Sequence, residues 1–129
     1  MKVRGVRGAI TVTENTEAAI LHATRTLLEN IVEVNQIAED DVASVFFTTT
    51  PDLDAVFPAK SARDMGWRQV ALMGAQETPV PHGIPMCIRI LIHWNTEKAL
   101  NDVKHVYMGD AETLRPDLYP KFRVSIKGE

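Results

Sequence analysis

The spacing of apolar residues along the chain indicates helices in three places. Residues 14–36 carry apolar side chains at nearly helical intervals, and Asn15 or Thr16 can cap the first turn, so this segment is predicted as a long helix. A segment that starts after a proline and ends at a glycine predicts a short helix over 59–65. A turn or a further short helix is expected over 97–102.

Five other segments are short and are either alternating or rich in β-branched and aromatic residues, as strands are. They are residues 2–12, 42–50, 69–73, 86–95 and 106–108. Residues 74–85 are dense in Gly and Pro and are predicted as a loop, and a second loop is expected after residue 108. The order of the elements predicts one α+β domain over residues 1–129, with a mixed β-sheet and helices packed on one face.

Such a sheet leaves its second face uncovered. In a chain of 129 residues, burial of that face against identical copies is the natural solution, so a symmetric oligomer is expected. The last residues, about 118–129, are expected to form a flexible tail.

The composition restricts the partners and the compartment. A hydrophobic fraction of 45% is enough to fill one core, and a net charge of -3 provides no uniform attraction to nucleic acid or to an anionic membrane. Neither is expected as a partner. The single cysteine, Cys87, cannot form an intramolecular disulfide and is predicted to be a buried apolar residue of a cytoplasmic protein. No segment approaches the roughly 18 apolar residues that cross a bilayer.

Arginine occurs at three positions where a charge is costly. Arg7 and Arg89 lie inside predicted strands, and Arg63 lies on the short helix. A guanidinium group is seldom buried without a carboxylate, a backbone acceptor or an anionic ligand, although on an alternating strand each could equally point to solvent or form a structural ion pair. The sequence contains no nucleotide-binding, serine-nucleophile or zinc-protease motif, and its histidines lack ligand spacing. No cofactor or metal ion is therefore expected.

Four blocks of the sequence resemble one enzyme family. They are RGVRGAITV near the N-terminus, TPDLDAVFPAKSAR in the middle, CIRI after a loop that contains QE, and HVYMGDAETLRPDL near the end. In this order and spacing, from Val3 to about Leu118, they resemble the monofunctional chorismate mutases of the trimeric, Bacillus-type class. The resemblance implies a ferredoxin-like, chorismate-mutase-like subunit that forms a trimeric pseudo-α/β barrel, with active sites between neighbouring subunits.

The resemblance also implies a reaction, the intramolecular Claisen-type rearrangement of chorismate to prephenate in the biosynthesis of phenylalanine and tyrosine. This reaction needs no nucleophile, cofactor or metal ion, which agrees with the motifs that the sequence lacks. Catalysis would come from holding the substrate in its compact conformer and from fixed charges placed where charge develops.

Carried over residue by residue, the family pattern implies that Arg89 faces the ether oxygen of the breaking bond and that Glu77 accepts a hydrogen bond from the ring hydroxyl. Arg7 would hold a substrate carboxylate, aided by the hydroxyl of Tyr107. At Gly74 the family pattern has a cysteine, so only the backbone can contribute here. Further substrate contacts are implied for Phe57, Ala59, Lys60 and Arg63 of the adjacent subunit, for Met73, Gly74, Ala75 and Gln76 in the binding loop, and for Leu114 and Arg115 in a mobile C-terminal segment.

Two other functions stay open at this point. One is a non-catalytic trimer that binds small anions, which would keep the arginines but convert nothing. The other is an imine deaminase on a similar trimeric architecture, in which an interfacial arginine holds a carboxylate. The QE loop, the CIRI strand and the VYMGDAETLRPDL segment favour the mutase, and analogy of fold alone could not make that choice.

Overall fold

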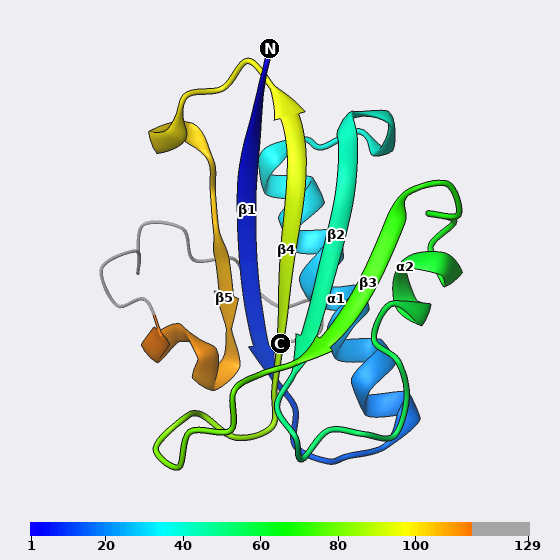
Figure 1. Ribbon diagram of the computed structural model, residues 1–129, viewed down its shortest axis with the longest axis vertical. Coiled ribbons are helices and arrows are strands. Elements are labelled where there is room, and N and C mark those ends of the chain that lie inside the picture. The colour runs from blue at the N-terminus through cyan, green and yellow to red at the C-terminus, as the bar shows by residue number, and fades with distance from the viewer. Residues whose placement is uncertain (115–129) are drawn as a thin grey trace.

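A mixed β-sheet forms the body of the computed structural model, which describes residues 1–114 (Figure 1). The five strands follow the order β3-β2-β4-β1-β5, in which β4 runs antiparallel to β1 and β2, while β5 and β3 join the sheet in parallel. The predicted mixed α+β sheet is confirmed, whereas the predicted tail at 118–129 lies outside the described residues. The elements are β1 (Lys2–Thr11), α1 (Glu17–Asn35), η1 (Glu39–Asp41), β2 (Val42–Thr49), α2 (Lys60–Asp64), β3 (Ala71–Gln76), β4 (Cys87–Thr96), η2 (Leu100–Asp102), β5 (Val106–Met108) and η3 (Gly109–Leu114).

The long helix α1 covers one face of the sheet (Figure 1). Its start is capped by Thr16, whose Oγ1 accepts a hydrogen bond from the backbone N–H of Ala19 at 3.1 Å. Ile20 and Ile31 are fully buried in the core between helix and sheet. Gly8 of β1 permits this close packing, because a Cβ atom at that position would lie 2.5 Å from Cδ1 of Ile31.

Alternation along β4, the central strand, separates the two faces of the sheet. Ile88, Ile90 and Ile92 are buried in the core on the α1 side. Arg89 and Leu91 lie between them and are only half-buried, because successive side chains of a strand point to opposite faces. The charged residue of this apolar strand therefore belongs to the face opposite α1.

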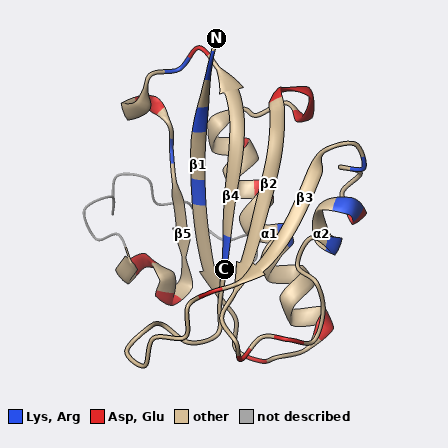
Figure 2. Ribbon diagram, in the orientation of Figure 1, with Lys and Arg blue, Asp and Glu red and all other residues tan. Residues whose placement is uncertain are grey.

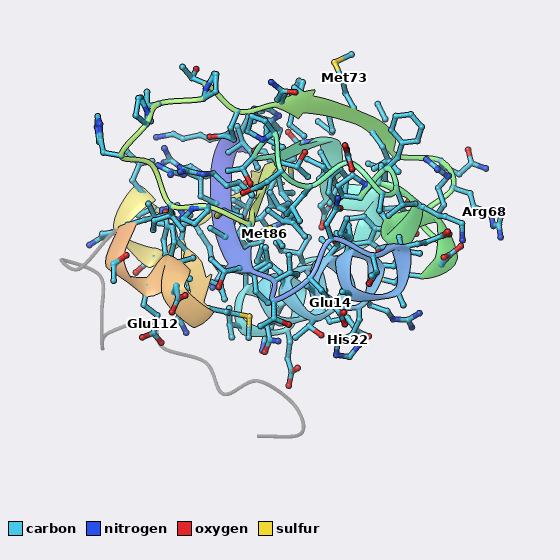
Figure 3. The ribbon with its side chains drawn as sticks, turned by 90° about the horizontal axis from the view of Figure 1, so that it is seen from below. Glu14, His22, Arg68, Met73, Met86 and Glu112 are labelled. Atoms are coloured by element: carbon cyan, nitrogen blue, oxygen red, sulfur yellow. The ribbon has the colours of Figure 1, made fainter. Side chains whose placement is uncertain are left out.

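The face opposite α1 is called the open face below. Among the described residues, η3 alone of the helices packs on it, where Ala111 is buried against Ala9, Cys87 and Tyr107, and the rest of the face carries no helix. Figure 3 shows Met73 of β3 on this side and His22 of α1 on the other. Met73 is 61% exposed, and Phe46 and Leu91 are half-buried. The symmetric oligomer expected to bury this face remains a prediction.

The third strand differs from its prediction. It begins at Ala71 instead of residue 69 and extends to Gln76, so the predicted loop of 74–85 starts three residues too early. Gly74 to Gln76 are held in the sheet by parallel pairing with β2, in which Phe47 opposes Gly74 and Thr49 opposes Gln76. The pairing comes from a segment far away in sequence, so the local Gly content that indicated a loop was a poor guide.

Two segments near the C-terminal end contain 3₁₀ turns. Of the turn or short helix predicted over 97–102, the structure forms the turn, three residues of 3₁₀ helix at Leu100–Asp102, and its one large apolar residue, Leu100, is 70% exposed. A segment this short with no face to bury does not sustain an α-helix. The loop expected after Met108 contains the 3₁₀ helix η3. Within residues 1–114, none of the helices combines the length and the apolar character needed to cross a bilayer.

Candidate active site

Arg89 lies on the open face near the start of β4, the central strand of the sheet. It is flanked by two strands, with Ala9 of β1 opposite it on one side and Thr48 of β2 on the other. Its side chain is 30% exposed. A cation in the middle strand of a sheet needs an acceptor, so the environment of this guanidinium group defines the site.

Glu77 is the carboxylate closest to Arg89. It directly follows β3, and its backbone N–H donates to the carbonyl of Thr49 at 2.9 Å, which extends the β2–β3 pairing by one residue. Glu77 Oε1 lies 3.3 Å from Arg89 Nε, and the carboxylate side chain is 26% exposed. The contact is an ion pair without hydrogen-bond geometry, because Arg89 Nε donates to no group among the described residues. The two groups therefore lie close together, but no hydrogen bond from Arg89 Nε fixes their relative position.

Arg7 brings a second cation to the open face. Its guanidinium carbon lies 5.9 Å from the ring centroid of Tyr107, which is within the range of a cation–π contact. Tyr107 stands on β5 opposite Ala9 of β1, and its side chain is buried. The backbone N–H of Arg7 donates to Nδ1 of His105 at 3.0 Å, so the loop before β5 is tied to β1 at the same place.

Arg7, Glu77 and Arg89 line one cleft of about 310 Å³ on the open face, whereas Tyr107 is not among its lining residues. Two guanidinium groups and one carboxylate line it, so it favours a ligand with negative charge and a hydroxyl group. Figure 2 shows bands of Lys and Arg within β1 and β4, whereas acidic residues lie outside the strands. The lining residues are Arg7, Phe46, Thr48, Glu77, Arg89, Ile90 and Leu91.

Cys87 lies two residues before Arg89 and is completely buried, as predicted. Burial raises the pKa of its thiol, and the neighbouring Arg89 guanidinium opposes that rise only in part. The thiol is thus protonated at neutral pH and is a poor nucleophile. Cys87 packs with Tyr107 and Ala111, and Leu114 contacts this small cluster. The structure therefore brings Leu114 to the cluster that contains Tyr107, while Arg115 lies outside the described residues.

The end of β2 holds both partners of the Arg89–Glu77 pair. Thr49 anchors Glu77 as described above. Thr50 Oγ1 accepts from the backbone N–H of Cys87 at 3.0 Å, and the two carboxylate oxygens of Asp52 accept from the N–H of Met86 at 3.2 and 3.0 Å. Met86 has a left-handed φ of 53°, which is uncommon for a residue with a side chain. The Thr50–Asp52 turn thus fixes the start of β4, two residues before the arginine.

A second hollow lies under the proline-rich loop. It has a volume of about 410 Å³ and shares Glu77 and Arg89 with the cleft, so the ion pair forms a wall between the two spaces. Asp52 also lines it. Within residues 1–114, no cluster of three or more His, Cys, Asp or Glu side chains has an arrangement that could hold a metal ion.

The other predicted contact residues form a separate group near α2. Phe57 is 78% exposed and, with residues 74–76, lines a third hollow of about 590 Å³. Arg63 is exposed, and Lys60 Nζ is paired with Asp64 at 3.1 Å. Ala59 is buried in the core, which makes its side chain unavailable to a ligand. Within one chain, none of this group lines the Arg89 cleft.

Sequence reasoning missed the apolar residues Phe46, Ile90 and Leu91 that line the cleft, and two polar residues, Thr48 and Asp52. Thr48 lines the cleft and stands opposite Arg89, and Asp52 holds the start of β4. Thr48 belongs to a run of three threonines, and period-two alternation would have grouped it with Phe46 on one face. That grouping could not reveal the functional face, because the register between β2 and β4 is a tertiary property.

Comparison with known proteins agrees with this geometry. The sequence pattern of the family described as chorismate mutase type I matches residues 3–118. Among curated proteins, a chorismate mutase from Thermus thermophilus is 50% identical over 117 residues, covering 90% of this chain and 96% of that protein. A chorismate mutase from Bacillus subtilis (strain 168) is 43% identical over 119 residues, covering 92% and 94%.

The solved structures include a chorismate mutase from Clostridium thermocellum that superposes with a TM-score of 0.85 and is 47% identical. The match covers 86% of this chain and 99% of that one. Sequence and fold agree over nearly the whole described chain. The chain therefore belongs to the chorismate mutase type I family.

Proposed function

We propose that the Arg89 cleft is the place where this chorismate mutase, an isomerase of aromatic amino acid biosynthesis, converts chorismate to prephenate. The observation that carries the proposal is the convergence of Arg7, Glu77 and Arg89 in one cleft on the open face. Family membership supports the reaction, and the geometry supports the site. The lone, buried thiol supports a reducing compartment, so we place the enzyme in the cytoplasm.

The rearrangement breaks a carbon–oxygen bond and forms a carbon–carbon bond within one molecule. Negative charge develops on the ether oxygen as the bond breaks. Arg89 is suited to face that oxygen, because a fixed cation in a partly dry cleft stabilises developing charge without having to reorganise. No group of the protein needs to form a covalent bond, which fits the protonated state of the Cys87 thiol.

The remaining groups of the cleft suit the other parts of the substrate. Chorismate carries two carboxylates and a ring hydroxyl. Glu77 can accept a hydrogen bond from the hydroxyl, and Arg7, supported by the ring of Tyr107, can bind a carboxylate. Binding at these three points holds the compact conformer in which the two reacting carbons approach each other.

A homotrimer would bring the second group of residues to the cleft. Phe57 and Arg63 lie near α2, at the far edge of the β2–β3 pair from Arg7. In a ring of three subunits, each interface joins two different surfaces, so the hollow beside Phe57 on one subunit can meet the Arg89 cleft of the next. The part of the open face that carries no helix and the strong exposure of Phe57 and Met73 support such an interface.

The direct test is to mix the purified chain with chorismate and follow the loss of its diene absorption. We expect turnover without any added cofactor, and identification of prephenate as the product would complete the assignment. A chain that binds chorismate without converting it at micromolar enzyme would favour the anion-binding trimer. Release of ammonia from an imine substrate, without chorismate turnover, would favour the deaminase.

The turn that fixes β4 provides a second test. Replacement of Asp52 by Ala removes the acceptor of the Met86 N–H, so we expect the free energy of unfolding to fall by about 1–2 kcal/mol. Without these hydrogen bonds the start of β4 would move, and Arg89 would shift relative to Glu77. We therefore expect kcat/KM to fall about tenfold. Urea unfolding and steady-state kinetics measure the two effects. Asp102→Ala, in the exposed turn η2, is the matched control and should change neither. Full activity in a destabilised Asp52→Ala chain would limit this turn to a role in folding.

A further inference from the structure

Two polar atoms of the cleft are buried and lack a hydrogen bond among the described residues. They are Oγ1 of Thr48 and Nε of Arg89. Buried polar groups are nearly always paired in folded proteins, since an unpaired one costs free energy. Such groups in a substrate cleft are candidates for interactions that form only when the ligand is bound.

The two orphaned atoms belong to residues that stand directly opposite each other. Thr48 of β2 is the register partner of Arg89 of β4 in the antiparallel pair, and both line the cleft. Opposed residues of an antiparallel pair have Cβ atoms about 4.5–5.5 Å apart. A threonine hydroxyl is therefore within reach of the guanidinium group of its partner after a small side-chain movement.

Glu77 accounts for the present arrangement. Its carboxylate lies 3.3 Å from Arg89 Nε and attracts the guanidinium group, yet the contact has no hydrogen-bond geometry. When Glu77 accepts a hydrogen bond from the substrate hydroxyl, its hold on Nε weakens. Thr48 Oγ1 can then accept from Nε, which leaves the terminal nitrogens of Arg89 to face the ether oxygen.

We propose that Thr48 is a positioning residue for Arg89 in the rearrangement. Its hydroxyl is buried even in the free chain, so it acts through the guanidinium group and not by direct contact with the substrate. This role rests on the proposed function of Arg89 and Glu77. The role explains why a buried hydroxyl without a hydrogen bond, which by itself destabilises the fold, is present at this position.

Thr48→Val and Thr48→Ser separate the hydroxyl from the shape of the side chain. Valine keeps the β-branched shape but has no oxygen, so kcat should fall about 10- to 100-fold while KM changes by less than about threefold. The melting temperature should stay the same or rise, because an orphaned buried hydroxyl is removed. Serine keeps the oxygen and should retain most of kcat. Thr13→Val, in the exposed bend after β1, is the matched control and should behave like the wild type.

A Thr48→Val enzyme with wild-type kcat would overturn the proposal. So would a Thr48→Ser enzyme as impaired as the valine variant, because volume and not the hydroxyl would then be responsible. If Thr48→Val folds poorly, Thr48→Ala repeats the comparison with serine. A wild-type chain that does not convert chorismate would overturn the proposed function and this role together, whereas an active wild type with an unaffected valine variant refutes this role alone.

Discussion

Replacing Arg89 with citrulline is expected to lower kcat by a factor of about 10² or more, with a much smaller effect on substrate binding. Citrulline keeps the shape and most hydrogen-bond donors of arginine but carries no charge. The loss of one preorganised donor at a developing oxyanion costs about 3 kcal/mol, and a cation that is 30% exposed beside Glu77 should contribute at least as much. Because the charge on the ether oxygen exists only in the transition state, kcat should absorb the loss.

Pre-steady-state binding gives the dissociation constant of the substrate and steady-state kinetics give kcat. Together they show whether the substitution affects substrate binding or the chemical step. Arg89→Gln is the genetically encoded counterpart of the citrulline variant and should show the same separation of kcat from the dissociation constant. Arg25→Gln, on the exposed surface of α1, removes an equal charge far from the cleft and should leave both values unchanged. An equal loss in kcat and in substrate affinity would mean that Arg89 binds ground state and transition state alike, contrary to the role proposed here.

Two inactive variants are expected to restore activity when they are mixed. One carries Arg89→Ala, which damages the open-face cleft, and the other carries Phe57→Ala with Arg63→Ala, which damages the group near α2. In a ring of three interfacial sites, a site is intact when both of its contributing subunits supply undamaged residues. Random assembly of equal amounts should therefore restore about one quarter of the wild-type activity.

Unfolding and refolding the two variants together allows the subunits to exchange, and activity is compared with that of each variant refolded alone. The control is a single chain that carries all three substitutions, refolded in the same way, because it cannot form an intact site. Light scattering on the same samples measures the oligomeric state. Lack of restoration in a demonstrated mixed trimer, or full activity of a monomer, would rule out a site shared between subunits.

Local sequence was a reliable guide where one segment decides its own structure. The helix predicted over 14–36 is observed as α1, because its apolar stripe and the Thr16 cap act within a few residues of each other. The strands predicted at 2–12 and 86–95 were also nearly correct. The third strand was displaced because Gly74–Gln76 becomes strand only through pairing with β2.

The residues of the candidate site also divide into those that the sequence indicated and those that only the tertiary structure revealed. The cost of a charge among aliphatic residues marked Arg89 from the sequence alone, and the resemblance to a known family added Glu77, Arg7 and Tyr107. The sequence could not reveal Thr48, because the role proposed for it depends on its position opposite Arg89 in the β2–β4 pair. Nor could the alternation of single strands show that Phe57 lies away from the Arg89 cleft within one chain.

By itself, the sequence determined the class of fold and the family and marked Arg89 as a candidate site residue, because hydrophobic periodicity, the cost of a buried charge and contiguous motifs are properties of short segments. Only the tertiary structure decided the register of β2 on β4, the ion pair between Arg89 and Glu77, and the separation of the predicted contact residues into two groups. These features depend on which distant strands meet and with what offset. A shift of one residue would turn Thr48 and Arg89 to different faces of the sheet, so the geometry of the cleft is a consequence of packing across the whole chain.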